Sequence, residues 1–408
     1  MKRSARAGRA ARAALLVSVA LPVGVGCSGL LGIDAPSLLM PEGPDGGVAD
    51  ATGIETETGS HDAARDTSMT DSAVLDSARG GSDAAFDARP TTDGPERLDG
   101  SDGGFDGNCA CTSDACAPVV LANEQAAPTH VAVDSNGVYW INTAGNVAST
   151  GSVMRADLDG TNRSVVAQDL YAPQDVAVGG GNLYWSSIAS PGGLAGRTTA
   201  PPYTALALPM ASAVAIAAND DTVAWVGMIA GKAALLEFDP STDAGSTLVA
   251  DPGAQALITI DGTSAFWVTS GTVSGIATCR LSGCTTATGF WTSNDQVGGL
   301  TNDGVNVYWT DGVSSAVYAC PTGGCVHSPP SPLATLSESP TFVVSDGTHV
   351  YVATAVFAPP SGSIVRLDLD GGAPTVIVQG AQPAGLAVGS TCVYWTDSDG
   401  GYVYASPK

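Results

Sequence analysis

Two polar side chains stand at equivalent places in the sequence and could together perform acid–base chemistry. His130 lies ten residues before Trp140, and Asp175 lies ten residues before Trp185. An imidazole and a carboxylate are suited to general acid–base catalysis, here of the kind that a lyase or a lactonase performs. The alternative is that both are ordinary surface residues at the starts of strands. The chemistry depends on whether the intervening elements bring these two positions side by side.

No other catalytic motif accompanies this pair. The sequence has no Gly-x-Ser-x-Gly nucleophile motif, no His-Glu-x-x-His helix and no glycine-rich phosphate loop. Metal-dependent hydrolases need several convergent acidic or amide ligands, and residues 118–408 contain only three glutamates: Glu124, Glu237 and Glu338. We therefore expect no catalysis, no cofactor and no metal. A lyase or hydrolase that uses His130 and Asp175 is kept as the alternative.

The composition excludes two broad classes of protein. The chain has 408 residues, with 16 Lys and Arg against 40 Asp and Glu, and a formal net charge of −24. A nucleic-acid-binding surface needs clustered cations, so no nucleic acid is expected as a partner. No run of about eighteen apolar residues exists, so a polytopic membrane protein is excluded as well.

The N-terminus predicts export. Basic residues precede the short apolar run from Ala13 to Gly26, which is the arrangement of a signal peptide, and we place this signal at residues 1–26. The run ends in Val-Gly-Val-Gly followed by Cys27, which resembles a bacterial lipobox. The resemblance implies that Cys27 is lipidated and that this lipid alone anchors the protein in the cell envelope, at the outer membrane or the cell surface. Ordinary signal cleavage before Cys27 is the alternative.

Residues 27–117 have a different character and are rich in Asp, Gly, Ala, Ser and Thr. Between Pro41 and Asn108 only eight large apolar residues occur. Such a segment cannot bury enough apolar surface to offset the loss of chain entropy. It is predicted to be a disordered acidic tether.

Residues 118–408 contain an internal repeat. A marker position, usually the second of an aromatic pair, recurs every 40 to 45 residues, at Trp140, Trp185, Trp225, Trp267, Trp309, Val352 and Trp395. Six residues before each marker stands an Asp, Asn or Gly, which tight turns accept because these residues tolerate positive φ. Four short strands in each repeat predict an all-β fold: a β-propeller of seven four-stranded blades. A six-bladed ring is the alternative.

The two ends of residues 118–408 are predicted to meet. The last repeat lacks a fourth strand, and residues 118–122 have the composition to supply it. Pairing of this segment with the last blade would close the ring and hide both sheet edges. Cys392 begins a strand of the same blade, so a bond to it from Cys109, Cys111 or Cys116 would lock the ring covalently.

The remaining cysteines favour disulfides. Without Cys27 the chain has eight cysteines, an even number in an exported protein. Cys279 and Cys284 are separated by four residues, as are Cys320 and Cys325, and each pair is predicted to bridge its own hairpin. Zinc is the alternative, but it would require two such pairs to converge from different blades.

Two repeats contain the literal sequence Tyr-Trp-Thr-Asp, from Tyr308 to Asp311 and from Tyr394 to Asp397. With the regular spacing, they make residues 118–408 similar to YWTD propellers of the low-density lipoprotein receptor class B type, here in a bacterial lipoprotein. In that family the motif is structural and lies on the second strand of each blade. The resemblance implies that four tryptophans are core residues: Trp140, Trp185, Trp309 and Trp395. Receptor-type propellers of this family usually have six blades, and ligand choice does not follow from the fold.

We expect a binding or scaffold module for an unidentified protein or glycan partner, and a monomer. Propellers place ligands on the face that carries the loops between second and third strands and those between blades. On this face the sequence places four candidate ligand-binding residues: Tyr171, Trp291, Asp311 and Phe357. A purely structural component of the envelope is a further alternative.

Overall fold

The computed structural model describes residue 109 and residues 117–146, 150–188, 193–198, 212–229, 232–242, 244–250, 253–269, 274–284, 286–293, 296–325, 330–357 and 360–408. All of them belong to one of the two units into which the chain divides, residues 92–408. The predicted signal peptide (1–26), Cys27, Cys111, Cys116 and nearly all of the predicted tether (27–117) lie outside the described residues. None of the described residues belongs to a helix that is long and apolar enough to cross a bilayer.

The first half of this unit contains four antiparallel sheets. The first has β2 (Pro128–Asp134), β3 (Gly137–Asn142), β4 (Gly151–Ala156) and β5 (Ser164–Leu170), with a 3-10 turn, η1 (Ala144–Asn146), after β3. The second has three described strands, β6 (Pro173–Gly179), β7 (Asn182–Ser187) and β8 (Gly193–Thr198). The third has β9 (Ser212–Ala218), β10 (Val223–Ile229), β11 (Lys232–Asp239) and β12 (Ala244–Ala250). The fourth has β13 (Ala254–Ile260), β14 (Ser264–Thr269), β15 (Ser274–Arg280) and β16 (Thr288–Ser293).

The second half continues the same pattern. One sheet has β17 (Val297–Asn302), β18 (Asn306–Asp311), β19 (Ala316–Pro321) and β20 (Pro332–Thr335). The next has β21 (Ser339–Ser345), β22 (His349–Phe357), β24 (Ser363–Asp368) and β25 (Thr375–Gln379), and the short β23 (Pro360–Ser361) pairs with β22. The last sheet has the order β1 (Val119–Ala122), β28 (Tyr402–Pro407), β27 (Cys392–Asp397) and β26 (Gly385–Val388).

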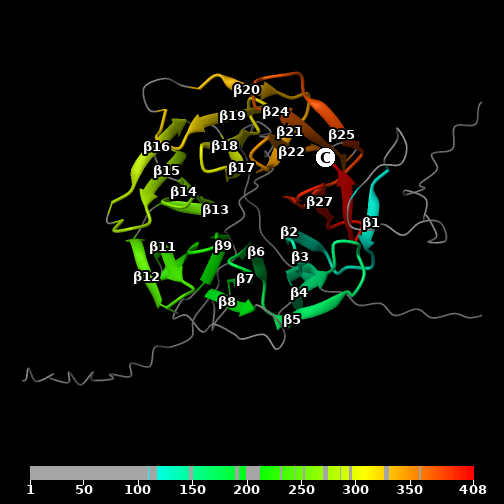
Figure 1. Ribbon diagram of the computed structural model, residues 1–408, viewed down its shortest axis with the longest axis horizontal. Helices are drawn as coiled ribbons and strands as arrows, with labels where there is room; N and C mark the ends of the chain where they lie inside the picture. Colours follow the sequence, from blue (N-terminus) through cyan, green and yellow to red (C-terminus); the bar gives the residue numbers. More distant parts are fainter. Residues whose placement is uncertain are drawn as a thin grey trace, which may run out of the picture. The chain divides into compact units, whose positions relative to one another are not determined.

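These sheets form a β-propeller, as the repeat predicts. The innermost strand is the first of each sheet except the last, where it is β26, and the inner strands pack against one another in a closed cycle, in the order β2, β6, β9, β13, β17, β21, β26 and back to β2. Figure 1 shows the sheets arranged radially around the central axis of the unit. Six of the sheets have at least four strands, and β6, β7 and β8 form the remaining one.

The ring is closed by pairing between strands from its two ends. β1 pairs antiparallel with β28, and Val119 lies opposite Ala405. Gln125, directly after β1, accepts hydrogen bonds on its Oε1 from Trp140 Nε1 and from Asn142 Nδ2, each at 3.0 Å. The predicted role of residues 118–122 as the outer strand of the last sheet is therefore confirmed.

A disulfide reinforces this closure. Cys109 is bonded to Cys392, with their Cα atoms 5.6 Å apart and 283 positions apart in the sequence. Both side chains are buried beside Leu121 of β1 and Val403 of β28. Of the three partners that the sequence left open for Cys392, the structure therefore selects Cys109.

The second-strand tryptophans make the contacts between sheets. Trp140, Trp225, Trp267 and Trp309 are at most 1% exposed, and Trp185 and Trp395 are also buried. Each packs against the preceding sheet; Trp309 of β18, for example, lies in a cluster with Phe266 of β14 and Phe290 of β16. The expectation that Trp140, Trp185, Trp309 and Trp395 are core residues is confirmed.

The turn residue six positions before the repeat marker acts through its side chain and not through positive φ. The Oδ1 atom of Asp303 accepts the backbone N–H groups of Val305 at 2.8 Å and Asn306 at 2.7 Å. The corresponding residues Asp134, Asn219, Asp261 and Asp346 accept two turn N–H groups in the same way. None of these five residues has positive φ. The explanation from positive φ is wrong, and the physical reason is that a short carboxylate or amide satisfies the N–H groups of the hairpin.

The same aspartates are linked to the tyrosines of the repeat motif. Tyr308 donates its hydroxyl hydrogen bond to Asp303 Oδ2 at 2.7 Å, and Tyr351 donates to Asp346 Oδ2 at 3.0 Å. Tyr139 donates to Asp134 Oδ1 at 3.3 Å. In these three repeats the tyrosine thus fixes the turn five residues before it.

A half-buried ion pair joins the last two sheets. Lys408 Nζ lies 2.6 Å from Asp346 Oδ2 and 6.0 Å from the centroid of the Tyr351 ring. The Asp346 side chain is only 11% exposed. Burial alone would raise the pKa of Asp346, but hydrogen bonds from Lys408, Thr348 and His349 outweigh it and hold the pKa well below its usual value.

We expect replacement of Lys408 by Met to lower the free energy of unfolding at pH 7 by about 1.5–3 kcal/mol, the range for a hydrogen bond to a charged group. Because the folded-state pKa of Asp346 is depressed, the contribution is complete above the ordinary pKa of aspartate. It is lost as the pH falls through the folded-state value. Urea denaturation of both proteins should therefore show a difference that persists at pH 4 and shrinks in stronger acid.

The control for this prediction is Arg155→Met. Arg155 pairs with Asp157 at 2.7 Å, but both side chains are about one-third exposed. Removal of such a surface pair should cost less than about 1 kcal/mol. A Lys408→Met difference that stays constant down to the lowest accessible pH would contradict the assignment to Asp346.

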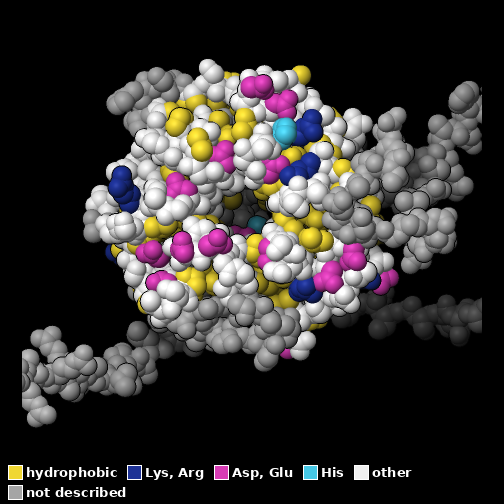
Figure 2. Space-filling view, viewed as in Figure 1, with side chains coloured by type: hydrophobic (Ala, Val, Ile, Leu, Met, Phe, Trp, Pro, Cys, Tyr) yellow, Lys and Arg dark blue, Asp and Glu magenta, His cyan; other side chains and the backbone are white. Residues whose placement is uncertain are grey.

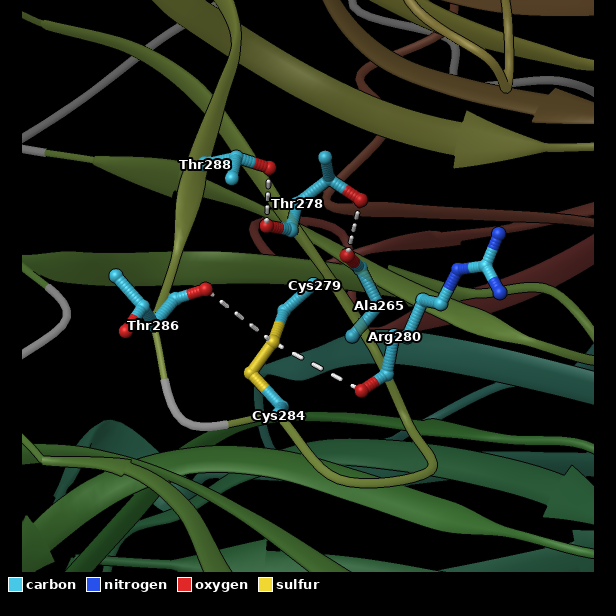
Figure 3. The surroundings of a disulfide bond; sticks show 7 residues. All are labelled: Ala265, Thr278, Cys279, Arg280, Cys284, Thr286 and Thr288. Atoms are coloured by element: carbon cyan, nitrogen blue, oxygen red, sulfur yellow. Dashed lines mark hydrogen bonds between the residues drawn. A yellow bond between two sulfur atoms is a disulfide. The ribbon is translucent and has the colours of Figure 1, made fainter.

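The two short-range disulfides are present as predicted. Cys279 is bonded to Cys284 and Cys320 to Cys325, with Cα–Cα distances of 5.7 and 5.9 Å. Figure 3 shows the Cys279–Cys284 bond beside β14, β15 and β16, where Thr278 Oγ1 donates to the Ala265 carbonyl oxygen at 3.0 Å. Each bond joins the end of the third strand of its sheet to the first part of the connection that follows it.

Candidate functional site

The inner strands place one residue each around the end of the central channel at which these strands begin. We define the channel mouth as the residues ten positions before the repeat markers: His130, Asp175, Ala215, Leu257, Gly299, Phe342 and Gly385. Figure 2 looks down the ring axis and shows that the molecule is hollowed at its centre, with acidic side chains around the hollow on the face in view. The channel mouth is the place where the sheets can offer side chains to a common ligand.

β-Bulges shape this end of the channel. In β2, Pro128 pairs with Asn142 and Val131 with Trp140, so Thr129 and His130 together stand opposite Ile141. In β6 the same irregularity leaves Gln174 and Asp175 opposite Ser186. Similar register shifts occur in β9, β13, β17 and β21. A bulge changes the direction in which side chains point. The side chains at this end of each inner strand therefore do not simply alternate between the two faces of the strand.

His130 and Asp175 are brought into electrostatic contact. Burial raises the pKa of Asp175 above its usual value, while nearby His130 and two backbone N–H groups act to lower it. Asp175 Oδ1 accepts the N–H of Val176 at 2.8 Å, and Oδ2 accepts the N–H of Ile216 at 3.0 Å. The carboxylate therefore bridges β6 to β9 of the next sheet, and it is more than an ordinary surface residue at the start of a strand.

His130 is less completely satisfied. Its Nδ1 atom is buried and has no hydrogen-bond partner among the described residues. Its ring lies 6.4 Å from the ring of Phe342 in an edge-to-face arrangement. A buried ring nitrogen that the protein leaves unpaired is available for a hydrogen bond to a ligand or to water.

The contact between His130 and Phe342 depends on a glycine. Phe342 belongs to β21, and β26 of the last sheet lies between it and β2. At Gly385 of β26, a Cβ atom would lie 2.9 Å from His130 Cα and 3.0 Å from Thr396 Oγ1. Glycine therefore lets β2 approach closely, and it places the Thr396 hydroxyl beside the His130 backbone. The Thr396 side chain is fully buried, and its Oγ1 has no partner within the described part of the chain.

A second group of aromatic side chains lies between two sheets. Trp291 of β16 contacts Trp309 of β18 with ring centroids 5.0 Å apart, and it lies 6.1 Å from Tyr318 of β19. Trp309 and Tyr318 are stacked, with centroids 5.6 Å apart and ring planes 17° apart. Trp309 is buried, whereas Trp291 and Tyr318 are half-buried. We call Trp291, Tyr318 and the adjacent Ser314 the aromatic platform.

Asp311 does not have the exposed position that a ligand-contacting residue requires, and this expectation is corrected. Its side chain is fully buried, and Oδ1 accepts the N–H of Val313 at 2.8 Å. Oδ2 accepts a hydrogen bond from Ser314 Oγ, which in turn lies 3.4 Å from the Tyr318 hydroxyl oxygen. Asp311 therefore positions Ser314 and Tyr318 of the aromatic platform and is itself withdrawn from solvent.

The other two candidates do not join the platform. Tyr171 lies between β5 and β6 and is 46% exposed, and its carbonyl oxygen accepts a hydrogen bond from Ser187 Oγ. Phe357 is the last residue of β22, but its side chain lies outside the described residues. The structure thus brings Trp291 and Asp311 together through Tyr318, and it leaves Tyr171 in the connection between two other sheets.

Sequence reasoning overlooked Phe342 and Tyr318 as site residues. Phe342 stands at the same repeat position as His130 and Asp175, but only the polar members of that set were considered for chemistry. Tyr318 has a periodic signal, because Tyr318 and Tyr404 each follow a marker tryptophan by nine residues. Tyr404 stacks on Trp395 with centroids 5.1 Å apart, just as Tyr318 stacks on Trp309.

Neither group of side chains forms a metal site. Among the described residues, no three His, Cys, Asp or Glu side chains gather closely enough to hold a metal ion. The chemistry that the two groups offer is hydrogen bonding, electrostatic contact and aromatic packing.

Comparison with solved structures shows the fold. An oligogalacturonate lyase from Vibrio parahaemolyticus matches with a TM-score of 0.52 at 8% identity, over 71% of this chain and 92% of that chain. A gluconolactonase from Xanthomonas campestris has a TM-score of 0.47 at 11% identity, over 72% of this chain and 89% of that one. A nidogen/laminin complex has a TM-score of 0.38 at 16% identity, over 62% and 79% of the respective chains.

Sequence comparison identifies one repeat. No curated protein matches the chain. Residues 136–178, which run from the β2–β3 turn to β6, match the low-density lipoprotein receptor repeat class B. The chain therefore carries a class B (YWTD) repeat of the low-density lipoprotein receptor type within a β-propeller.

Proposed function

We propose that this chain is an exported, lipid-anchored propeller of seven blades that binds a protein or glycan partner through the aromatic platform. The blade count is supported by the closed cycle of inner strands, in which β6 takes part like the inner strands of the larger sheets. Anchoring rests on the lipobox-like residues before Cys27. Loss of the protein from the membrane fraction on Cys27→Ser substitution is the corresponding test.

The observation that carries the binding function is the arrangement of Trp291 and Tyr318. Two half-buried aromatic rings lie against a buried one, Trp309, and so are held in a fixed orientation. Rigid aromatic side chains lose little conformational entropy on binding, which is why they dominate the energetics of many interfaces. Ser314 adds a hydroxyl group whose position is fixed by Asp311.

We assign no catalytic step to His130 and Asp175. Both oxygens of Asp175 accept backbone N–H groups, and one of these bonds links two sheets. The carboxylate is therefore held as part of the frame of the channel mouth. This arrangement suits recognition of a ligand more than repeated movement of a proton.

Affinity capture from an envelope extract tests the proposal. The purified chain should retain one dominant partner, and Trp291→Ala should reduce the retained amount at least tenfold, because hot-spot aromatic residues contribute about 2 kcal/mol or more. The matched control is Trp291→Phe, which keeps an aromatic ring and should retain most of the partner. Equal capture by the wild-type chain and by Trp291→Ala would refute the role of the platform.

A further inference from the structure

We propose that the channel mouth is a second binding site, for a small neutral ligand rich in hydroxyl groups, such as a monosaccharide or a cyclic polyol. The residues assigned to it are His130, Asp175 and Phe342, which come from the inner strands β2, β6 and β21. This site is separate from the aromatic platform and does not depend on it.

Polar groups form an arc along one side of the mouth. Asp175 uses one acceptor position on each oxygen for a backbone N–H group, and a carboxylate offers about four such positions in all. It therefore retains acceptors for ligand hydroxyl groups. His130 lies next in the arc, with its Nδ1 unpaired within the described residues.

The other side of the mouth is apolar or without side chains. Phe342 presents its ring near His130, and Leu257 lies at the equivalent position of β13. Gly299, Gly385 and Ala215 occupy three further positions and project almost nothing toward the axis. At Gly299 a Cβ atom would lie 2.9 Å from Val343 N, so the close packing of β17 and β21 requires glycine there. None of these three residues has a side chain long enough to reach into the hollow that Figure 2 shows at the centre of the ring.

The chemistry of these groups selects a neutral, hydroxyl-rich ligand. A hydroxyl group both donates and accepts, so it can pair with a carboxylate and with a ring nitrogen of an imidazole. The C–H face of a sugar or polyol ring can pack on Phe342, as in sites that combine apolar lining with a few placed polar groups. An anion would face the Asp175 carboxylate.

Saturation-transfer NMR on the purified full chain tests the site, with D-glucose and myo-inositol as probes and tetramethylammonium as a cationic comparator. Saturation should pass to the ring protons of at least one of the two hydroxyl-rich probes. His130→Ala and Phe342→Leu should each raise its dissociation constant at least tenfold. Phe342→Leu keeps an apolar side chain, so it tests the aromatic ring in a chain whose folding can be verified by circular dichroism.

Two controls separate this site from the rest of the molecule. His349→Ala removes a histidine that lies at the start of β22 and pairs with Asp368 at 3.4 Å, and it should leave binding unchanged. Trp291→Ala, which removes part of the aromatic platform, should also leave binding unchanged. The proposal is overturned if neither hydroxyl-rich probe receives saturation, or if His130→Ala binds as the wild type does. Loss of binding only in Trp291→Ala, or tighter binding of tetramethylammonium than of both probes, would overturn it as well.

Discussion

Replacement of Cys392 by alanine is expected to lower the free energy of unfolding by roughly 5 kcal/mol, because the disulfide to Cys109 closes a very long loop. The two cysteines are 283 positions apart in the sequence, so the bond restricts almost the whole propeller in the unfolded state. In the folded state it supports β1, a strand of only four residues at the outer edge of the last sheet. Without the bond, the short β1–β28 pairing and the packing of β26 and β27 against β2 must hold the ring closed.

Urea denaturation with circular dichroism measures this effect. Cys109→Ala breaks the same bond and should give the same loss as Cys392→Ala. Cys279→Ala is the control, because its disulfide spans only 5 positions and the same entropy relation gives about 2 kcal/mol. If Cys279→Ala and Cys392→Ala lower the free energy of unfolding equally, the stabilisation by the Cys109–Cys392 bond does not come from loop entropy.

The repeat made most of the fold predictable. Each marker tryptophan had to face an apolar environment, and the turn residue six positions earlier fixed the hairpin that carries it. The cross-strand neighbours confirm this register; Trp309, for example, lies opposite Leu300 and Tyr318. The same regularity placed the closing strand, because one repeat lacked a strand and the other end of the domain supplied a segment of the right composition.

Side-chain partners within turns were harder to infer. Asp311 follows the Tyr-Trp-Thr sequence at the end of β18, where a carboxylate in a loop is a reasonable ligand contact. The structure instead folds the following turn around it, so that the N–H of Val313 and the hydroxyl of Ser314 satisfy the carboxylate. Sequence patterns identify residue types that suit a turn, but they do not show which way a side chain points when both uses are chemically acceptable.

The channel mouth was only half predictable for a different reason. Repeat spacing correctly grouped His130 and Asp175 with Phe342 and Gly385, because equivalent positions of the inner strands meet around one axis. The contact of His130 with Phe342 passes over an intervening strand and depends on the missing side chain of Gly385. Such a contact depends on the curvature of the whole ring and on bulges, which no local pattern encodes.

Trp309→Ala is expected to lower the free energy of unfolding by about 3–5 kcal/mol, the range for removal of a buried tryptophan or phenylalanine. Trp309 is fully buried among Phe266, Phe290 and Tyr318, so its loss opens a cavity between two sheets. Trp309→Phe should cost much less. Its ring refills part of the space, and Trp309 Nε1 has no hydrogen-bond partner among the described residues.

Comparing the loss of stability in Trp309→Ala with that in Trp291→Ala tests whether Trp291 is a core residue or a binding residue. Trp291 is half-buried and packs on Trp309 from the neighbouring sheet, so its removal exposes a surface and opens no closed cavity. It should therefore cost less than about 2 kcal/mol of stability, since its side chain transfers only part of its area from solvent. If Trp291→Ala and Trp309→Ala destabilise equally in urea denaturation, Trp291 is a core residue. The aromatic platform then loses the ring on which partner binding was proposed. If only Trp309→Ala destabilises strongly, the two rings have separate roles: one holds the sheets together and the other remains free to contact a partner.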